Sequence, residues 1–371
     1  MSTGSKRSTG AKSSAESTGD FYNASPVLHP ASSSGGTASP ADMSSLIDNF
    51  GRRVSYLRLS VTDRCDFRCI YCMNEDTTFL RRAQILSLEE LADVGRNFVA
   101  MGVKKIRLTG GEPLVRPNVM WLIQQLGQLP GLEELTLTTN GSQLGRYASE
   151  LRAAGVKRLN ISLDTLKPER FVDMTRRDKL QQVLSGIEAA LDAGFERIKL
   201  NTVVLQGKNV DELDDLLNYA TERGMDISFI EEMPLGEVRT RDLQHTYLGN
   251  DALLEQLQQR YGLVASAETT GGPSRYYRIP GQRSRVGFIS PHSHNFCSTC
   301  NRVRVTVEGR LLLCLGNEHS VDLKSVLRRY PGDDQRLRQT LIDAMAIKPE
   351  RHHFSLSDEP QVLRFMNMTG G

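Results

Sequence analysis

Residues 54–72 read VSYLRLSVTDRCDFRCIYC, a strand-like run that leads directly into a loop with three cysteines. The run from Val54 to Val61 is rich in valine and leucine, as strands of parallel sheets are. Cys65, Cys69 and Cys72 follow it at once. In (β/α) barrels the loops at the carboxyl ends of the strands carry the site. We therefore expect a barrel whose first loop binds a metal centre.

Outward from this stretch, strand-like and helix-like segments alternate. Six consecutive strand–helix units predict an α/β fold with right-handed crossovers, a partial (β/α)₆ TIM-type barrel. An open doubly wound sheet has the same local pattern. The predicted strands are Val54–Val61, Val103–Thr109, Leu132–Thr138, Val156–Leu163, Arg197–Val204 and Asp226–Ile230. The predicted helices are Ser87–Met101, Asn118–Gly127, Gly145–Ala154, Lys179–Ala193 and Asn209–Arg223.

The chain divides into three regions. Residues 1–47 are rich in Ser, Thr, Gly, Ala and Pro and are predicted to be a disordered polar extension. A serine-rich start is also typical of organelle transit peptides, although arginine is nearly absent here. Residues 48–244 form the predicted barrel. Residues 245–371 form a smaller C-terminal region that we expect to cover one mouth of the barrel.

Composition excludes several classes of protein. The 46 Lys and Arg residues against 44 Asp and Glu residues give a net charge of +2, so no overall field attracts nucleic acid or a membrane. No run of eighteen apolar residues is present, and the start lacks the apolar core of a secretory signal. We expect a cytoplasmic protein. Six cysteines in such a chain are poor candidates for disulfides.

The spacing of the first three cysteines, C-x₃-C-x₂-C, suits an iron–sulfur cluster. Three thiolates in one short loop can hold three corners of a four-iron cube and leave the fourth iron free for a small molecule. A structural zinc site is the alternative, but it needs four ligands. No histidine lies near this loop to complete such a site.

Cys297, Cys300 and Cys314 form a second group, for which zinc is a serious competitor. Cys-x₂-Cys is common in zinc sites, and a nearby histidine would supply the fourth ligand. The candidate histidines are His292, His294 and His319. Spacing alone leaves zinc and an incomplete iron–sulfur cluster open.

Basic residues inside the predicted strands point to an anionic ligand. Arg302 and Arg304 alternate after Cys300 and would project to one side, forming a paired site for phosphate oxygens. A solvated charged strand is the alternative. A cation in a buried parallel strand is costly unless it is paired. Arg58, Lys105, Arg107 and Lys199 all lie in such strands, and a nucleoside triphosphate would supply enough negative charge.

Two motifs resemble those of the radical S-adenosylmethionine enzymes. The first is the C-x₃-C-x₂-C loop, with Tyr71 just before the third cysteine, and the second is Thr109-Gly-Gly-Glu-Pro113 at the end of the second strand. The resemblance implies that S-adenosylmethionine chelates the open iron of a [4Fe-4S] cluster and is cleaved to a 5′-deoxyadenosyl radical. Gly111 and its neighbour would let backbone groups approach the methionine amino group, and Glu112 would accept from it.

Within these enzymes the chain is similar to the GTP 3′,8-cyclase family of molybdenum cofactor biosynthesis. The matching stretches are 57–65, 106–113, 296–304 and the terminal Gly370-Gly371. The resemblance implies a second [4Fe-4S] cluster on Cys297, Cys300 and Cys314 that contacts the guanine base. It also implies conversion of GTP to (8S)-3′,8-cyclo-7,8-dihydroguanosine 5′-triphosphate, and a flexible Gly-Gly tail that reaches the active site. An external electron donor is expected, and the chain is compatible with a homodimer.

The resemblance also assigns binding residues one by one, while no side chain identifies itself as a catalytic acid or reductant. Positions that match S-adenosylmethionine contacts are Tyr71, Gly111, Ser162 and Met233. Positions that match GTP contacts are Arg58, Arg107, Thr138, Lys199, Arg302, Val303 and Arg304, with Lys105 as a weaker addition.

The chain departs from the family at two site positions. Ser228 stands in the sixth strand where members have arginine, so that substrate contact is missing or supplied elsewhere, and Asp66 stands where asparagine is usual. Two rival functions remain. A radical S-adenosylmethionine enzyme that modifies peptides would carry more cysteines after the barrel. A zinc-stabilised RNA-binding protein would need base-stacking aromatics, and aromatics make up only 6% of this chain.

Overall fold

A computed structural model describes residues 45–239, 242–352, 354–356 and 362–370. Most of the predicted disordered extension lies outside these residues. Its last part, residues 45–47, is packed: Leu46 is fully buried, and Ile47 forms an isolated bridge with Arg53. The folded region therefore begins earlier than the boundary at residue 48 that the composition predicted.

Six parallel strands form the predicted partial barrel and lie side by side in chain order. They are β1 (Tyr56–Ser60), β2 (Lys105–Thr109), β3 (Glu134–Thr139), β4 (Val156–Ser162), β5 (Arg197–Val204) and β6 (Asp226–Glu231). All six were predicted, with ends that differ by a few residues. The α/β barrel prediction is confirmed.

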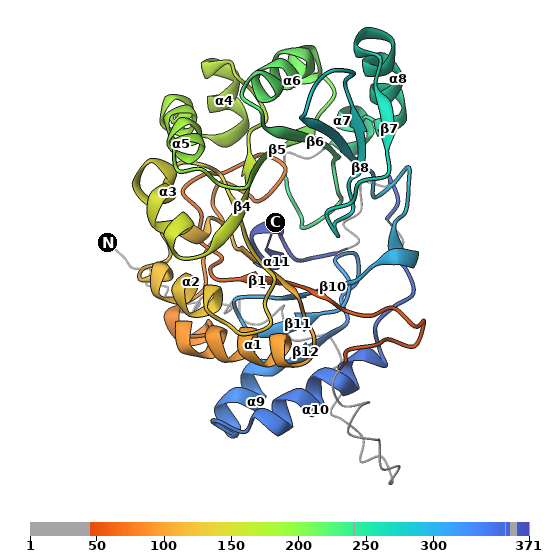
Figure 1. Ribbon diagram of the computed structural model, residues 1–371. Helices are drawn as coiled ribbons and strands as arrows, with labels where there is room; N and C mark the ends of the chain where they lie inside the picture. The colour runs from red at the N-terminus through yellow and green to blue at the C-terminus, as the bar shows by residue number, and fades with distance from the viewer. Residues whose placement is uncertain (1–44, 240–241, 353, 357–361, 371) are drawn as a thin grey trace, which may run out of the picture.

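Helices connect these strands and cover the outside of the curved sheet (Figure 1). They are α1 (Leu88–Ala100), α2 (Val119–Gly127), α3 (Leu144–Ala153), α4 (Pro168–Thr175), α5 (Leu180–Asp192) and α6 (Leu213–Glu222). Short 3₁₀ turns occur at Arg82–Gln84, Pro113–Val115, Val210–Glu212 and Cys297–Thr299. Of these six helices, α4 alone was not predicted from the sequence. A capping box begins α1, because the Glu90 N–H donates to Ser87 Oγ at 3.1 Å and the Ser87 N–H to the Glu90 carboxylate at 2.7 Å.

The C-terminal region extends the sheet instead of only covering a mouth. β9 (Arg285–Ile289) pairs parallel with β6, and β10 (Arg302–Val305) pairs parallel with β1. The sheet order in the described chain is β12-β11-β10-β1-β2-β3-β4-β5-β6-β9-β8-β7. The antiparallel outer strands are β7 (Val264–Ser266), β8 (Arg275–Arg278), β11 (Arg310–Leu312) and β12 (Ser320–Asp322). Both edges of the six-stranded arc thus receive a strand that periodicity did not predict.

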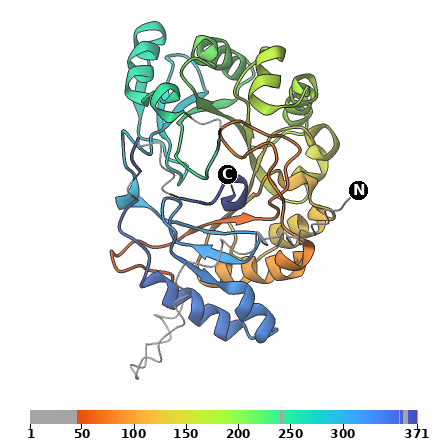
Figure 2. The ribbon, with the colours of Figure 1, turned by 180° about the vertical axis from the view of Figure 1, so that it is seen from behind.

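The remaining helices lie around this arc. They are α7 (Leu243–Thr246), α8 (Asn250–Tyr261), α9 (Leu323–Arg329), α10 (Asp334–Met345) and α11 (Met366–Thr369). α9 and α10 run along the outside beside α1, as both views show (Figure 1, Figure 2). α11 lies in the middle of the barrel (Figure 1). Among the described residues, no helix combines the length and apolarity that a membrane span requires.

Strand alternation decides which side chains face the interior of the barrel. Leu57 and Leu59 of β1 are fully buried in the apolar core, and each such leucine contributes about 1.5–3 kcal/mol by leaving water. Arg58 stands between them and points the other way, because successive side chains of a strand alternate between faces. The leucines of β1 therefore pack in the apolar core, and Arg58 faces the interior of the barrel.

Candidate active site

The loop after β1 carries the first cysteine group, Cys65, Cys69 and Cys72, here called the first trio. The Arg68 N–H donates to the Thr175 carbonyl at the end of α4 at 2.8 Å. Phe67 packs edge-on against Phe171 with ring centroids 5.6 Å apart. All three cysteines are free thiols. The loop is thus anchored to a helix by its backbone and by an aromatic contact, while its sulfur atoms bind no other cysteine.

Two glycines after β2 pack against the backbone that precedes the first trio. A Cβ atom on Gly110 would lie 2.6 Å from the Thr62 carbonyl oxygen, and one on Gly111 would lie 2.4 Å from that of Arg64. The Gly111 N–H donates to the Thr62 carbonyl at 2.8 Å. These glycines are therefore required for close backbone packing between the two loops.

The carboxylate of Glu112 is hydrogen-bonded to other residues of the protein. Its carboxylate accepts from the Leu114 N–H at 3.0 Å, from Thr139 Oγ1 at 2.9 Å and from the Asn140 N–H at 2.6 Å. Burial raises the pKa of this carboxyl to about 7, although the backbone donors act in the opposite direction. The sequence assigned Glu112 to an incoming amino group, whereas the structure shows it joining the loops after β2 and β3.

Asp164 holds Tyr71, which the resemblance assigned to S-adenosylmethionine. The Tyr71 hydroxyl donates to Asp164 Oδ2 at 2.7 Å, and the Val203 N–H donates to Asp164 Oδ1 at 2.8 Å. Burial raises the pKa of Asp164 to about 6. Asp164 therefore positions the tyrosine from the loop after β4, a role that the sequence does not indicate.

The first trio suits a metal cluster on electrostatic grounds. Burial, followed by the nearby Glu112 carboxylate, raises the pKa of Cys65. Burial also raises the pKa of Cys69. Thiolates are the form that binds metal, and ionised sulfur here would be costly without a positive partner. A cationic iron–sulfur core supplies that charge.

The second trio, Cys297, Cys300 and Cys314, lies before β10 and after β11, in an environment of opposite sign. His352 Nδ1 is 3.0 Å from Cys297 Sγ, and the Lys348 ammonium group is 3.7 Å from Cys300 Sγ. Burial opposes ionisation of Cys300, but the charges of Arg302 and Lys348 outweigh it and lower the pKa. Burial also opposes ionisation of Cys297, but His352 outweighs it and lowers the pKa, so the surroundings of these two cysteines favour the thiolate form.

Two of the three histidines proposed as zinc ligands have other contacts, and the histidine that lies beside the second trio is His352. His292 Nε2 bonds the Glu232 carbonyl at 2.9 Å, and His294 Nε2 contacts the Asp251 carboxylate at 2.6 Å. Within the residues that the structure describes, no three His, Cys, Asp or Glu side chains are placed to hold a metal ion as a group.

A cavity inside the barrel joins the second trio to a set of basic side chains. Its basic lining residues are Arg58, Lys105, Arg107, Arg158, Lys199, Arg302 and Arg304. No Asp or Glu is among the described residues that line it. We call this cavity the chamber. Such a lining favours an anionic ligand.

The cations in the chamber repel one another. Burial and then the Arg107 and Arg302 charges lower the pKa of Arg58 to about 10, although Tyr56 opposes this. Arg58 Nε is buried and has no hydrogen-bond partner in the described structure. Burial, followed by Arg58 and Arg302, also lowers the pKa of Arg304. A bound polyanion would relieve this repulsion and satisfy the unpaired donor.

Tyr56 is an anionic partner that the chain itself supplies. Burial opposes its ionisation, but Arg107, Arg58 and Lys105 outweigh burial and lower the pKa of the phenol to about 7. The Arg107 Nε–H donates to the Tyr56 oxygen at 2.5 Å. Because the unfolded value is 10.0, the unfolded chain binds more protons between these two values, so Tyr56 adds stability as pH rises.

Comparison with Tyr56→Phe tests this linkage without any ligand. The free energy of unfolding of the native protein, relative to that of the variant, should increase as pH rises from about 7 towards 10. Denaturant titrations of both proteins at several pH values measure the difference. A difference that stays constant over this range would contradict the phenolate assignment.

The structure brings most of the predicted GTP residues together. Arg58, Arg107, Lys199, Arg302, Val303 and Arg304 line the chamber, as do Lys105 and Met233. Thr138 does not line it but accepts a hydrogen bond from Arg107 Nη1 at 3.1 Å. Tyr71, Gly111 and Ser162 lie outside its lining, at or after the carboxyl ends of β1, β2 and β4. Arg158 was missed, although a cation in a parallel strand was the signal that identified the others.

The C-terminal tail contacts both parts of the site. Met366 lines the chamber, and the Asn367 side chain donates to the Asp63 carbonyl, just before the first trio, at 2.9 Å. The Gly370 carbonyl accepts from Arg304 at 2.7 Å and from Arg58 at 3.2 Å. The tail therefore reaches the basic lining, and Gly371 lies outside the described residues.

Comparisons with known proteins agree with this arrangement. Residues 59–220 match the radical SAM superfamily, and residues 225–354 match the family described as Molybdenum Cofactor Synthesis C. Streptococcus suis SuiB bound to S-adenosylmethionine has a similar fold, with a TM-score of 0.55, 13% identity, and 85% of this chain and 77% of that chain covered. That likeness concerns the fold alone.

Relatives with much higher identity are called GTP 3′,8-cyclase. The protein of Ectopseudomonas mendocina is 60% identical over 326 residues, which are 88% of this chain and 98% of the relative. That of Pseudomonas fluorescens is 61% identical over 327 residues, with the same coverage. Since the match spans nearly the whole of these relatives at such identity, the chain belongs to the GTP 3′,8-cyclase family of radical S-adenosylmethionine enzymes.

Proposed function

We propose that this chain converts GTP to (8S)-3′,8-cyclo-7,8-dihydroguanosine 5′-triphosphate, the first step of molybdenum cofactor biosynthesis. The observation that carries the proposal is the chamber, which has the second trio at one side and seven basic side chains without an acidic one among its described lining. A triphosphate supplies the charge that this lining needs, and a purine base reaches toward the cysteines.

The residues present fit two iron–sulfur clusters and S-adenosylmethionine. Residues 48–244 contain the first trio together with Tyr71, Gly111, Ser162 and Met233, which would hold S-adenosylmethionine. Residues 245–371 contain the second trio, whose [4Fe-4S] cluster would contact the guanine base. When bound and reduced by an external donor, the first cluster and S-adenosylmethionine supply a radical able to remove hydrogen from C3′ of the ribose.

The side chains of the chain itself orient the nucleotide. Arg58 and Arg107 approach the chamber from the neighbouring strands β1 and β2, and Lys199 approaches it from β5, so their charges converge on one volume. Arg302 and Arg304 approach from β10 on the other side of β1. Charged donors on both sides fix the phosphates, and the ribose then lies between the two trios. The Gly370 contacts bring the tail across this volume and limit the access of water.

The rival functions explain the chamber less well. A peptide substrate has no need of seven converging cations, and this chain has three cysteines after the barrel. An RNA-binding protein would present its cations on an open surface. Here Arg107 and Lys199 are only 5% and 6% exposed, so a folded nucleic acid cannot reach them.

Product identification tests the proposal. Oxygen-free protein with reconstituted clusters is incubated with GTP, S-adenosylmethionine and a chemical reductant. Mass and NMR spectra should show the 3′,8-cyclised triphosphate together with 5′-deoxyadenosine. Recovery of unchanged GTP from protein that cleaves S-adenosylmethionine would overturn the assignment.

A further inference from the structure

β6 contributes no cation to the chamber at Ser228, where the family resemblance places arginine. Ser228 is fully buried, and its hydroxyl lies 3.1 Å from Ser274 Oγ. A Cβ atom on Gly287, the register partner of Ser228 on β9, would lie 2.2 Å from Ser274 Oγ. The segment before β8 thus fills the space beside β6 and leaves no room there for a long basic side chain.

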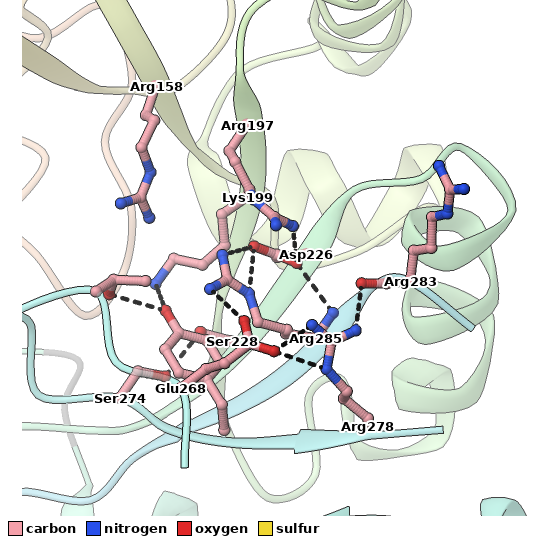
Figure 3. Close-up of polar contacts among 12 residues, drawn as sticks. Arg158, Arg197, Lys199, Asp226, Ser228, Glu268, Ser274, Arg278, Arg283 and Arg285 are labelled. Atoms are coloured by element: carbon pink, nitrogen blue, oxygen red, sulfur yellow. Dashed lines mark hydrogen bonds and ion pairs between the residues drawn. The ribbon is translucent and has the colours of Figure 1, made fainter. Parts of the chain in front are cut away.

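Two basic residues near Ser228 form ion pairs with carboxylates outside the chamber. Arg285 contacts Asp226 Oδ2 through Nη2 at 2.5 Å and through Nε at 3.1 Å, and its Nη1 lies 3.3 Å from Glu268. Arg197 lies 3.7 Å from Asp226, and its side chain is 43% exposed. Figure 3 shows both gathered around Asp226. Neither lines the chamber, so neither replaces a cation from β6.

Arg158 differs from both in position. It lies on β4, and its side chain is 13% exposed and lines the chamber. Its charge lowers the pKa of Lys199, after the larger contribution of burial and that of Arg107, so the two side chains share one electrostatic environment. In Figure 3 the Lys199 side chain extends toward the Arg158 side of the view, away from the Asp226 ion pairs.

The Glu134 carboxylate positions Arg158 without fully neutralising its charge. Arg158 Nη1 lies 3.2 Å from Glu134 Oε1, and the same oxygen lies 2.8 Å from the Lys105 ammonium group. Two cations therefore share a single anion, which leaves one positive charge uncompensated. The guanidinium has five N–H donors, so several remain for a ligand in the chamber.

We propose that Arg158 binds the triphosphate of GTP and supplies, from β4, the positive charge that β6 lacks in this chain. Glu134 is its positioning residue and holds Lys105 in the same way. This assignment rests on the proposed function. Bidentate contact with phosphate oxygens is the geometry that arginine favours, so the site should respond to the phosphate chain and not to the base.

Equilibrium binding of GTP and of guanosine to the cluster-loaded protein tests the assignment. Arg158→Gln should weaken GTP binding by about tenfold or more and leave guanosine binding unchanged. Arg158→Lys, which keeps the charge, should recover part of the loss. Arg197→Gln is the matched control, because Arg197 is the register partner of Arg158 on β5 and lies outside the chamber lining.

The outcomes separate this inference from the proposed function. Native protein that binds no GTP would overturn the proposed function itself. Native protein that binds GTP, together with Arg158→Gln of unchanged GTP affinity, would overturn the role of Arg158 alone. Equal losses of GTP and guanosine binding in Arg158→Gln would also overturn it, because a misfolded chamber and not a lost phosphate contact would explain them. The S-adenosylmethionine affinity and thermal midpoint of Arg158→Gln, both expected at the native value, report on the fold.

Discussion

Replacing Cys314 with serine should abolish cyclisation of GTP while S-adenosylmethionine cleavage continues. Cys314 lines the chamber with the other cysteines of the second trio, whereas the first trio lies after β1 on loops anchored to α4. Loss of an outer-shell partner of a metal ligand already costs 10- to 100-fold. Loss of a ligand should therefore lower the rate of GTP cyclisation by at least about 100-fold. Release of 5′-deoxyadenosine and formation of the cyclised product are measured in the same reaction.

Cys65→Ser is the matched variant in the first trio. It should abolish both S-adenosylmethionine cleavage and GTP cyclisation, because the first reaction supplies the radical for the second. If Cys314→Ser lost both activities to the same degree as Cys65→Ser, the two trios would not have the separate roles assigned to them.

Arg304→Ala should weaken GTP binding about 10- to 100-fold, since a hydrogen bond to a charged group contributes about 1.5–3 kcal/mol. Arg304 lies close to the charges of Arg58 and Arg302, and its Nη1 donates to the Gly370 carbonyl at 2.7 Å. The affinity for S-adenosylmethionine should not change. Because the substitution also removes repulsion between buried cations, the thermal midpoint of the ligand-free protein should not fall. Binding is followed by equilibrium titration and stability by calorimetry.

Arg310→Ala provides the control for Arg304. Arg310 lies on the adjacent strand β11, bonds Ser320 Oγ at 2.7 Å, and does not line the chamber. Its loss should leave GTP affinity at the native value. An unchanged GTP affinity in Arg304→Ala, or an equal loss in both variants, would refute a phosphate-binding role for Arg304.

Much of the fold could be predicted because the six βα units have local patterns. Runs of branched apolar residues and capping signals such as Ser87 and Glu90 are visible without tertiary information. The parallel pairing of β9 with β6 and of β10 with β1 could not be predicted. β10 follows β1 by more than two hundred residues, and such non-local pairing has no signature in the periodicity of either strand. α4 was missed because Pro168–Thr175 is short.

The parts of the site that could be predicted are those marked by a specific sequence motif. Three cysteines in eight residues identify a cluster loop by themselves, and cations in parallel strands identify an anion site. Contacts made through a third residue could not be predicted in this way. Asp164 holding Tyr71, His352 beside Cys297, and Lys348 beside Cys300 join segments that are distant in sequence. Arg158 is different, since the rule that selected Lys199 applies equally to it.

The metal content of oxygen-free protein tests most directly whether each trio of cysteines holds a four-iron cluster in which one iron has no cysteine ligand. Iron and sulfide analysis should give roughly eight of each per chain for two [4Fe-4S] clusters. In Cys314→Ser this content should fall to about four, with the spectrum of the first cluster retained. One zinc per chain at the second trio, with iron unchanged by the Cys314 substitution, would contradict the account.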